Sequence, residues 1–312
     1  MTLVVDANVV ISALVADSKT RERVVTLEPN LRPRERGSHR RTPRVGGCST
    51  GSGLPGRGNA EATVEPLVWG LRNEIGVAWN GRGEMFVAEN GDDNAPGRPI
   101  ADNYDATYRV RGGAWYGWPD VTANMDPVTS PNYRPTSSTI APQFVDSERQ
   151  PRELSFLIDH QASGLQRPEE SLVAGLHEVN SSPSKPDVAP RSWGEYADQL
   201  FVPEYGGFQW VTNALRDKPA GSRVVVIDTE ADGPQRVRPF VQNAKPGLAS
   251  KQGRPGEGLE RPYDVKFGPD DAMSVVDFGV QRGSPKRIAD GHFPIEWDRE
   301  TGVVWRVPLT AY

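Results

Sequence analysis

Polar and apolar residues alternate along much of residues 61–312, in short runs separated by turn residues. One pattern occurs three times: two mostly polar residues, Met or Leu, Phe or Ser, Val, any residue, an acid, any residue and Gly. The copies are GEMFVAENG at 83–91, DQLFVPEYG at 198–206 and DAMSVVDFG at 271–279. The first and third copies extend backwards through Ile75–Asn80 and Tyr263–Gly268, which have the same offset from each other as the copies themselves. Alternation around a tight turn predicts a β-hairpin at these copies.

A strand, turn, strand and terminal Gly that recur along a chain indicate repeated β-units. The copies start at positions 83, 198 and 271, a spacing that is too long for a solenoid and suits propeller blades with insertions. We expect that one copy has been lost between the first two. Further strands are predicted at Glu84–Val87, Arg223–Ile227 and Gly302–Val307, and long loops at 120–150 and 177–192. Since helical periodicity is scarce, the predicted class is all-β.

The composition agrees with an all-β fold, and the net charge bears on which kinds of molecule the protein binds. The 32 Gly and 28 Pro suit short strands joined by turns, and a net charge of -5 argues against nucleic acid as the main partner. The single Cys48 excludes an intramolecular disulfide. No run approaches the 18 or so apolar residues of a membrane span, so none is expected. Asp6 and Asp17 flank the apolar run near the N-terminus, which is unlike a secretory signal.

Residues 1–30 form the first of three regions. Leu3–Val5 reads as a buried strand that ends at Asp6, and Asn8 begins a helical pattern. This resembles the opening of a PIN-domain nuclease, which implies that Asp6 would help bind a divalent metal. A PIN-type metal-dependent ribonuclease is therefore one alternative function. Few other acids follow before position 60 to complete such a site, so we interpret this short α/β stub as a PIN-like fragment.

Residues 31–60 form the second region, with seven Arg, no Lys, one acid and few apolar residues. Such a segment cannot bury enough apolar surface to offset chain entropy, and we predict a disordered basic linker. An arginine-rich tail that binds nucleic acid is the other interpretation. The third region, 61–312, carries the repeat.

Specific motifs in the third region resemble the glucose/sorbosone dehydrogenase family, which includes soluble quinoprotein glucose dehydrogenase. Early matches are Gly70-Leu-Arg-Asn73, Glu89-Asn-Gly91, Arg98-Pro99, Asp105 and Gly113-Ala-Trp-Tyr-Gly-Trp-Pro-Asp120. Later matches, in the same order, are Asp159–Leu165, Trp193–Val202, Arg261–Pro269, Val275–Gly279 and Thr301–Arg306. The resemblance runs from about position 65 to position 312.

This resemblance implies a six-bladed β-propeller that binds pyrroloquinoline quinone (PQQ) over Ca²⁺ and oxidises the hydroxyl of a sugar or aldose. A cationic clamp would hold the carboxylates of the quinone, oxygen ligands would hold Ca²⁺, and a His would take the proton. Family members usually work outside the cytoplasm. The compartment of this chain is not readable from its sequence.

By the same resemblance, Arg72 and Asn73 would contact the cofactor, with Arg261 as a further cation at the rim. Gly91, Asp92 and Asp105 would surround Ca²⁺. Alternatively, Arg72 braces the inner rim and the acids at 92–93 form a solvated turn. Ile75 stands where the quinoprotein subgroup often has Gln, which weakens the cofactor assignment.

The catalytic base has no clear candidate. In the family it comes from a blade upstream of the Arg-Asn pair, where this chain has only His39. His160 lies inside a family-like motif and is a weak candidate, with a structural role as the alternative. Trp115, Tyr116 and Trp118 are expected to pack in the blade rather than to stack on a sugar.

The third region is long enough for about four blades of a partial propeller. An open arc would expose unpaired strand edges, through which the chain could self-associate. The favoured function is PQQ-dependent sugar oxidation, with activity in doubt because N-terminal blades are missing. The alternative is a non-catalytic propeller that binds carbohydrate or another protein.

Overall fold

The computed structural model describes residues 48–49, 63–92, 98, 100–135, 153–207, 219–284 and 295–309, with side chains from residue 65 onward. The chain divides into two compact units, Met1–Trp69 and Gly70–Tyr312. In the first unit, β1 (Cys48–Ser49) pairs antiparallel with β2 (Thr63–Val64). The predicted PIN-like fragment 1–30 lies outside the described residues, as does the rest of the predicted linker 31–60.

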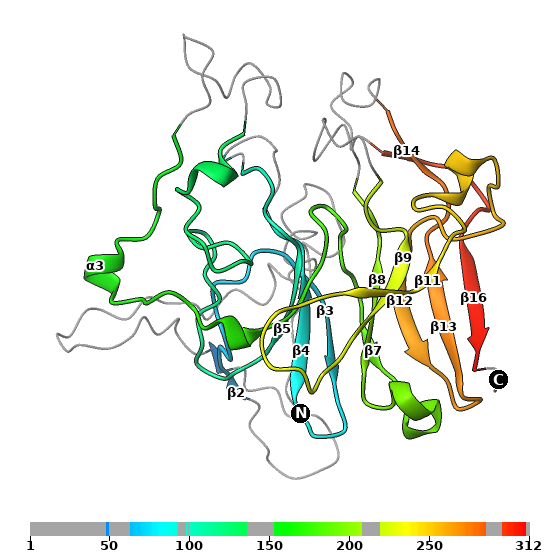
Figure 1. Ribbon diagram of the computed structural model, residues 1–312, viewed down its shortest axis with the longest axis horizontal. Coiled ribbons are helices and arrows are strands. Elements are labelled where there is room, and N and C mark those ends of the chain that lie inside the picture. The colour runs from blue at the N-terminus through cyan, green and yellow to red at the C-terminus, as the bar shows by residue number, and fades with distance from the viewer. Residues whose placement is uncertain are drawn as a thin grey trace. The chain divides into compact units, whose positions relative to one another are not determined.

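The second unit contains three mainly antiparallel sheets (Figure 1). Most neighbouring strands in them are consecutive or nearly consecutive in the sequence. The first sheet contains β3 (Glu74–Trp79), β4 (Met85–Glu89), β5 (Ala106–Arg109) and β6 (Val173–Leu176), with the short β10 (Gln235–Arg236) at its edge, joined by a parallel pairing with β6. The second contains β7 (Asp187–Val188), β8 (Leu200–Glu204), β9 (Arg223–Ile227) and β11 (Arg238–Gln242). The third contains β12 (Pro262–Phe267), β13 (Ala272–Asp277) and β16 (Val303–Pro308).

The remaining described elements are short. They are the hairpin β14 (Gln281–Gly283) and β15 (Ile295–Trp297), helix α3 (His160–Ser163), and 3-10 turns at Pro131–Tyr133, Glu170–Leu172, Arg191–Tyr196 and Ala249–Gln252. The all-β prediction is therefore confirmed, and the three meandering sheets are those of a partial propeller. None of the described helices is long and apolar enough to cross a membrane.

The repeated pattern forms equivalent strands. Val77 pairs with Val87 in the first sheet and Val265 pairs with Val275 in the third, at the offset that relates the first and third copies. The predicted strand Arg223–Ile227 coincides with β9, and the predicted strand Gly302–Val307 differs from β16 by one position at each end. These strands could be predicted because their alternation and turn residues are local signals.

The predicted loss of one copy between the first two is wrong. β5 and β6 pair within one sheet although residues 110–172 separate them. In the described parts of that interval the chain forms turns, α3 and 3-10 helices instead of a blade. An insertion inside one blade thus accounts for the long spacing. For the same reason the described residues form three blade-like sheets where about four were expected.

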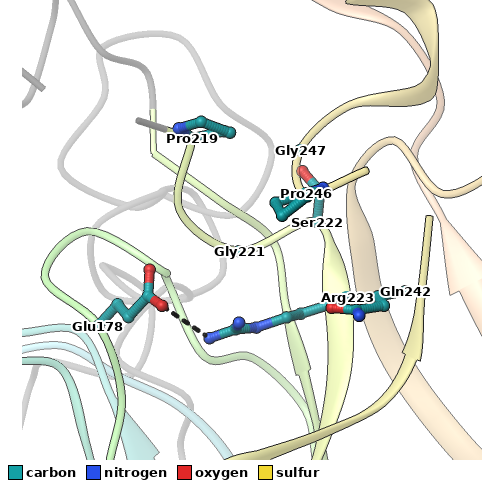
Figure 2. A pocket seen from close by; sticks show the side chains of 8 residues that line it. All are labelled: Glu178, Pro219, Gly221, Ser222, Arg223, Gln242, Pro246 and Gly247. Carbon is teal, nitrogen blue, oxygen red and sulfur yellow. Dashed lines mark ion pairs between the residues drawn. The ribbon is translucent and has the colours of Figure 1, made fainter. Parts of the chain in front are cut away.

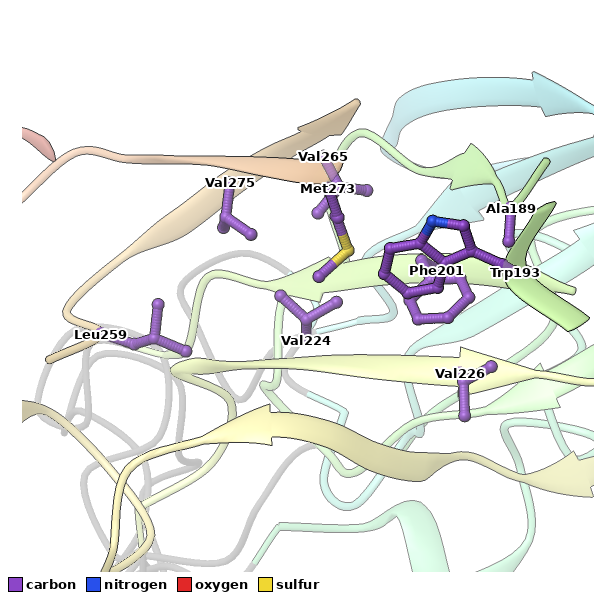
Figure 3. Close-up of a cluster of buried hydrophobic side chains, with 9 residues drawn as sticks. All are labelled: Ala189, Trp193, Phe201, Val224, Val226, Leu259, Val265, Met273 and Val275. Carbon is purple, nitrogen blue, oxygen red and sulfur yellow. The ribbon is translucent and has the colours of Figure 1, made fainter. Parts of the chain in front are cut away.

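The second sheet is covered on both faces. Along β8, Leu200 and Val202 face the first sheet, and Phe201 faces the third. One apolar cluster joins the first and second sheets: Ala78, Phe86, Ala88, Ala174, Leu200, Val202, Val225 and Ile227. The other joins the second and third sheets and is drawn in Figure 3: Ala189, Trp193, Phe201, Val224, Val226, Leu259, Val265, Met273 and Val275. A strand buried on both faces explains the unbroken apolar run in β9.

The insertion covers the other face of the first sheet. The ring of Tyr116 meets that of Tyr108 edge to face at 5.1 Å, and its hydroxyl donates to the carbonyl of Arg109. Both tyrosines are buried. The expected packing of Trp115 and Tyr116 inside the blade agrees with this burial, whereas Trp118 is 40% exposed.

Candidate functional site

The acid of each repeat lies at the end of a strand and is buried. Glu89 ends β4, Glu204 ends β8 and Asp277 ends β13. Each accepts hydrogen bonds from inside the protein, as Glu89 does from the backbone N–H of Arg72 at 2.9 Å. Asp277 accepts from the backbone N–H groups of Glu260 and Arg261, both at 2.8 Å. Glu89 and Asp277 therefore fix the entry to a neighbouring strand, whereas Glu204 bonds the side chains of His177 and Arg223.

Arg72 holds the turn that follows β4. Its Nη1 donates to the carbonyl oxygens of Asn90 at 3.1 Å and Gly91 at 2.6 Å. Its Nε lies 3.5 Å from Oδ1 of Asp92. Oxygens of three consecutive residues thus converge on one guanidinium. The neighbouring Asn73 accepts a hydrogen bond from the backbone N–H of Asn90 through its own carbonyl at 3.0 Å.

The motif before Arg72 docks on the tryptophan motif. Trp118 donates its backbone N–H to the carbonyl of Gly70 at 2.8 Å. Gly70 has a φ of +77°, and a Cβ there would lie under 3.0 Å from the Trp115 ring. Only glycine accepts both the left-handed backbone and this close approach without strain. Two motifs that are far apart in the sequence therefore build one site.

Asp105 links the first sheet to the second. Its Oδ1 accepts the backbone N–H of Gly91 at 2.7 Å, and its Oδ2 accepts the backbone N–H of Ser182 at 2.8 Å. The backbone N–H of Gly206 in turn donates to the carbonyl of Ser181 at 2.7 Å. Arg261 then donates to the carbonyl of Gly206 at 2.7 Å. A continuous band of hydrogen bonds thus joins the turns that follow β4 and β8 to the start of β12.

The carboxylates near Arg72 resist ionisation. Burial raises the pKa of Asp92, although the charge of Arg72 and a hydrogen bond from Trp118 act in the opposite direction. Burial also raises the pKa of Glu89 well above its usual range, against the hydrogen bond from the Arg72 backbone. A cation near these groups would favour their charged forms, since an opposite charge stabilises a carboxylate.

Part of the predicted calcium set fits a hard cation. The oxygens of Asn90, Gly91 and Asp92 converge on a positive group, as oxygen ligands of Ca²⁺ do. Each oxygen of Asp105 accepts a backbone N–H, so this carboxylate holds the turns together, and its direct contact with a cation stays a prediction. The described residues contain no cluster of three or more His, Cys, Asp or Glu that could hold a metal. A cation here would therefore depend on backbone carbonyls and would compete with Arg72.

Arg261 is buried where β12 begins. Its side chain donates through Nη1 to the carbonyls of Tyr205, Gly206 and Gly207. The residue is only 4% exposed, and burial lowers the pKa of its guanidinium. Its direct contact with a cofactor stays a prediction, since the structure gives this side chain a role in holding the turn after β8.

His160 begins α3 in the insertion. One ring nitrogen, Nε2, lies 3.1 Å from Oδ2 of Asp120, and the ring packs between Trp115 and Phe156 at 5.6 and 5.1 Å. The imidazole is about one quarter exposed, whereas Asp120 is fully buried. Asp120 also accepts the backbone N–H groups of Leu157 and Ile158. A buried carboxylate thus orients a solvent-accessible histidine, as in a general base and its positioning partner.

Sequence reasoning missed a second histidine network. His177 is fully buried, with Nδ1 2.8 Å from Oε1 of Glu204 and Nε2 2.8 Å from the hydroxyl of Thr107. Arg223 donates through Nε to Oε2 of the same glutamate at 2.6 Å. The repeat acid at 204 was the available signal, because a buried acid requires partners. The identity of those partners could not be read from sequence, since they lie on β5, β9 and the turn after β6.

No protein-family model and no curated protein matches this chain. Several solved structures do match it. A calcium structure of the Trichoderma reesei carbohydrate-active enzyme of family AA12 has a TM-score of 0.42 and 15% identity, over 70% of this chain and 51% of that one. The holo form of the pyranose dehydrogenase PQQ domain from Coprinopsis cinerea has a TM-score of 0.41 and 18% identity, over 67% and 52%.

The PQQ-bound aldose sugar dehydrogenase from Streptomyces coelicolor has a TM-score of 0.34 and 16% identity, over 72% of this chain and 42% of that one. The chain spans about half the length of the solved structures that it matches.

Proposed function

We propose that the second unit oxidises the hydroxyl of a sugar or aldose with PQQ as acceptor. The observation that carries this proposal is the convergence of the Asn90, Gly91 and Asp92 oxygens on Arg72. It occurs inside the motif that resembles the glucose/sorbosone dehydrogenases. A cationic side chain beside hard oxygen donors is the combination that an anionic quinone and Ca²⁺ require.

Bound PQQ would supply the acceptor for the hydride, which carries both electrons, from the sugar carbon. The carbonyls of Asn90 and Gly91 and the carboxylate of Asp92 would hold Ca²⁺. Arg72 and Asn73 would contact the acidic oxygens of the quinone. Because Arg72 now occupies the same oxygens as a cation would, metal binding and release of the Arg72 side chain are coupled in this proposal.

His160 is the histidine that fits a proton acceptor. Of the two histidines in the described residues, His177 has both ring nitrogens bonded in the interior. His160 is accessible and keeps Nδ1 on the side away from its hydrogen bond with Asp120. In this proposal Nδ1 takes the proton of the sugar hydroxyl and Asp120 positions the ring.

Thermal unfolding of the full chain with Ca²⁺, with PQQ and with both tests the binding step. Ligands that bind only the folded protein raise its melting temperature. We expect the largest increase with both ligands, and a loss of most of that increase in Asp92→Asn. A melting temperature indifferent to both ligands contradicts the proposal.

Dye-linked oxidation of D-glucose by the protein loaded with Ca²⁺ and PQQ tests the chemical step. General base catalysis contributes about 10²–10⁴-fold, so His160→Asn should lower kcat by a factor in that range. The variant should keep the increase in melting temperature with both ligands. Equal kcat in His160→Asn and the parent protein would remove His160 from the proposal.

The second candidate is a non-catalytic propeller that binds carbohydrate or a protein. Its supporting observation is that Arg72 and Arg261 both hold backbone carbonyls. Sugar binding without turnover, at any concentration of Ca²⁺ and PQQ, would favour this function. A PIN-type ribonuclease activity would belong to residues outside the described ranges, and its test is Mn²⁺-dependent RNA cleavage that is lost in Asp6→Asn.

A further inference from the structure

A pocket lies at the ends of β9 and β11, and none of the residues of the Arg72 cluster lines it. Its volume is about 310 Å³, at the small end of the range for ligand sites. Figure 2 shows the Arg223 side chain extending across it toward Glu178. The lining residues are Glu178, Pro219, Gly221, Ser222, Arg223, Gln242, Pro246 and Gly247.

The guanidinium of Arg223 is fixed in place. Its Nε donates to the fully buried Glu204 at 2.6 Å, and Glu204 is held from its other side by His177. Its Nη2 lies 3.5 Å from Oε1 of Glu178. Arg223 is therefore a preorganised donor, and the ordering entropy of its side chain is lost on folding instead of on binding.

The charges around the pocket do not favour an anion. Burial opposes the charged form of Glu204, yet the hydrogen bond from His177 and the charge of Arg223 lower its pKa. Burial likewise opposes the charge of Arg223, and Glu204 nevertheless raises its pKa. Glu204 thus already pairs with the charge of Arg223, and Glu178 lines the pocket beside it. A ligand carboxylate would therefore meet the negative charge of Glu178 at short range.

The same groups suit vicinal hydroxyls. Glu178 offers acceptors, Arg223 offers donors and the Gln242 amide offers both. Pro219 and Pro246 add apolar surface without polar groups that need partners. A hydroxyl can donate and accept at once, so a polyol can satisfy this mixed set without charge.

We infer that this pocket binds a neutral, hydroxyl-rich ligand of about monosaccharide size, with Arg223, Glu178 and Gln242 as its polar contacts. Glu204 and His177 are positioning residues that act through Arg223. The site shares no lining residue with the Arg72 cluster and does not depend on the proposed oxidation.

The test is titration of the full chain, without Ca²⁺ or PQQ, with D-glucose and D-glucuronate, followed by saturation-transfer NMR. These probes share one ring and differ by a carboxylate. We expect D-glucose to bind at least about fivefold more tightly than D-glucuronate, because the carboxylate lies beside the like charge of Glu178. Equal or tighter binding of D-glucuronate, or no binding of D-glucose, overturns the inference.

Variants locate the bound sugar. Glu178→Ala should raise the Kd for D-glucose about tenfold, the effect of one lost hydrogen bond to a charged group, and Gln242→Ala about fivefold. Both residues are exposed, so these variants should fold. Glu230→Ala, an exposed acid on the turn after β9, is the matched control and should leave the Kd unchanged.

The Kd for D-glucose in Asp92→Asn shows whether the sugar binds in this pocket or at the Arg72 cluster. If the sugar binds at the pocket, Asp92→Asn leaves the Kd for D-glucose unchanged. A Kd that rises in Asp92→Asn and not in Glu178→Ala would place the sugar at the Arg72 cluster and overturn the inference, while leaving the proposed function intact.

Discussion

Arg72 competes with any cation for the carbonyls of Asn90 and Gly91. Its guanidinium satisfies both oxygens and lies near Asp92, so the site carries a positive charge of its own. A buried carbonyl that loses its partner costs about 1–3 kcal/mol. The affinity for Ca²⁺ therefore depends on how much more strongly these oxygens bind Ca²⁺ than they bind the guanidinium of Arg72.

Replacing Arg72 should lower the stability of the protein without Ca²⁺ and strengthen the binding of Ca²⁺. Without the metal, Arg72→Ala should lower the free energy of unfolding by about 1–3 kcal/mol, because the two carbonyls lose their donor. With the metal, much of that loss should be recovered and the Ca²⁺ affinity should exceed that of the parent chain. Chemical denaturation with and without Ca²⁺ measures both. Arg306→Ala, which removes an exposed ion pair with Asp270, is the control. A Ca²⁺ affinity unchanged in Arg72→Ala would exclude the competition.

Glu89 should lower stability as the pH rises. Its pKa in the folded protein is raised by burial, so the folded state holds its proton where the unfolded chain has released it. The stability contribution of Glu89 is then complete below the unfolded pKa of about 4.3 and is lost as the pH rises through the folded pKa. Glu89→Gln should therefore be more stable than the parent chain at pH 7 and equal to it near pH 4. Urea denaturation across this pH range gives the comparison.

Glu84, on the same hairpin, should change stability with pH in the opposite direction from Glu89. Its pKa is lowered, chiefly by the hydrogen bond from Asn80 with help from Arg82 and Arg109. Its stabilising contribution is present above the unfolded pKa and is lost as the pH falls through the folded pKa. Glu84→Gln should thus lose stability at pH 7. If the stability of Glu89→Gln and that of Glu84→Gln changed with pH in the same direction, the pKa shifts assigned to both residues would be contradicted.

At the scale of the strand, the glycine that ends each repeat lies where another segment of the chain passes close to the backbone. Gly91, Gly206 and Gly279 end the three copies, and each would place a Cβ under 3.0 Å from backbone of a neighbouring segment. Those segments contain Tyr104, Ala220 and Thr301. Gly206 and Gly279 also have positive φ. The glycine recurs because the chain passes close to each of these turns.

Gly279→Ala should destabilise the protein strongly. The new methyl meets the Thr301 backbone, and the left-handed conformation adds about 1–2 kcal/mol. With about 1–3 kcal/mol for overpacking, the expected loss is about 2–5 kcal/mol. Gly233→Ala is the matched control, because its φ is +75° but no atom lies within 4 Å of the added Cβ. Gly233→Ala should lose only the stability that the left-handed backbone conformation costs. Equal losses in thermal unfolding would refute a role for the close contact.

At the scale of the whole second unit, the middle sheet holds the other two. Trp193 illustrates this, since its ring lies 4.7 Å from Phe267 of the third sheet and 5.5 Å from Phe201 of the second. Its Nε1 donates to the carbonyl of Asp271 at 3.0 Å. Sheets that share buried side chains are expected to unfold together.

Trp193→Ala tests that coupling. Loss of a large buried aromatic side chain should lower the free energy of unfolding by about 3–5 kcal/mol. Because the cluster spans two sheets, the loss should appear in a single transition that far-ultraviolet circular dichroism and tryptophan fluorescence report alike. Two separated transitions would mean that the sheets unfold independently.

Self-association through open sheet edges stays a prediction. The outward face of the third sheet carries the exposed Val304 and Val276 beside the charged Lys266 and Arg306. Charges on an exposed sheet oppose pairing with another chain. Sedimentation velocity over a range of protein concentrations would measure the outcome.

The candidate site was only partly readable from the sequence. Arg72, Gly91 and Asp92 were singled out by the family resemblance, and the structure brings them together because they flank one hairpin. The role of Asp105 did not, since its partners Gly91 and Ser182 come from separate segments. The buried position of Arg261 was missed as well, because exposure depends on what packs over a residue.

Residues 70–312 determine by themselves a set of antiparallel hairpins with equivalent turns, because alternation, turn residues and repeat offset act between neighbours in sequence. Tertiary structure alone decided how many sheets form, since the insertion 110–172 belongs inside one sheet and not to a separate blade. It also decided which oxygens meet Arg72 and which histidine reaches solvent. Those outcomes depend on contacts between segments distant in sequence, and no local pattern encodes their partners.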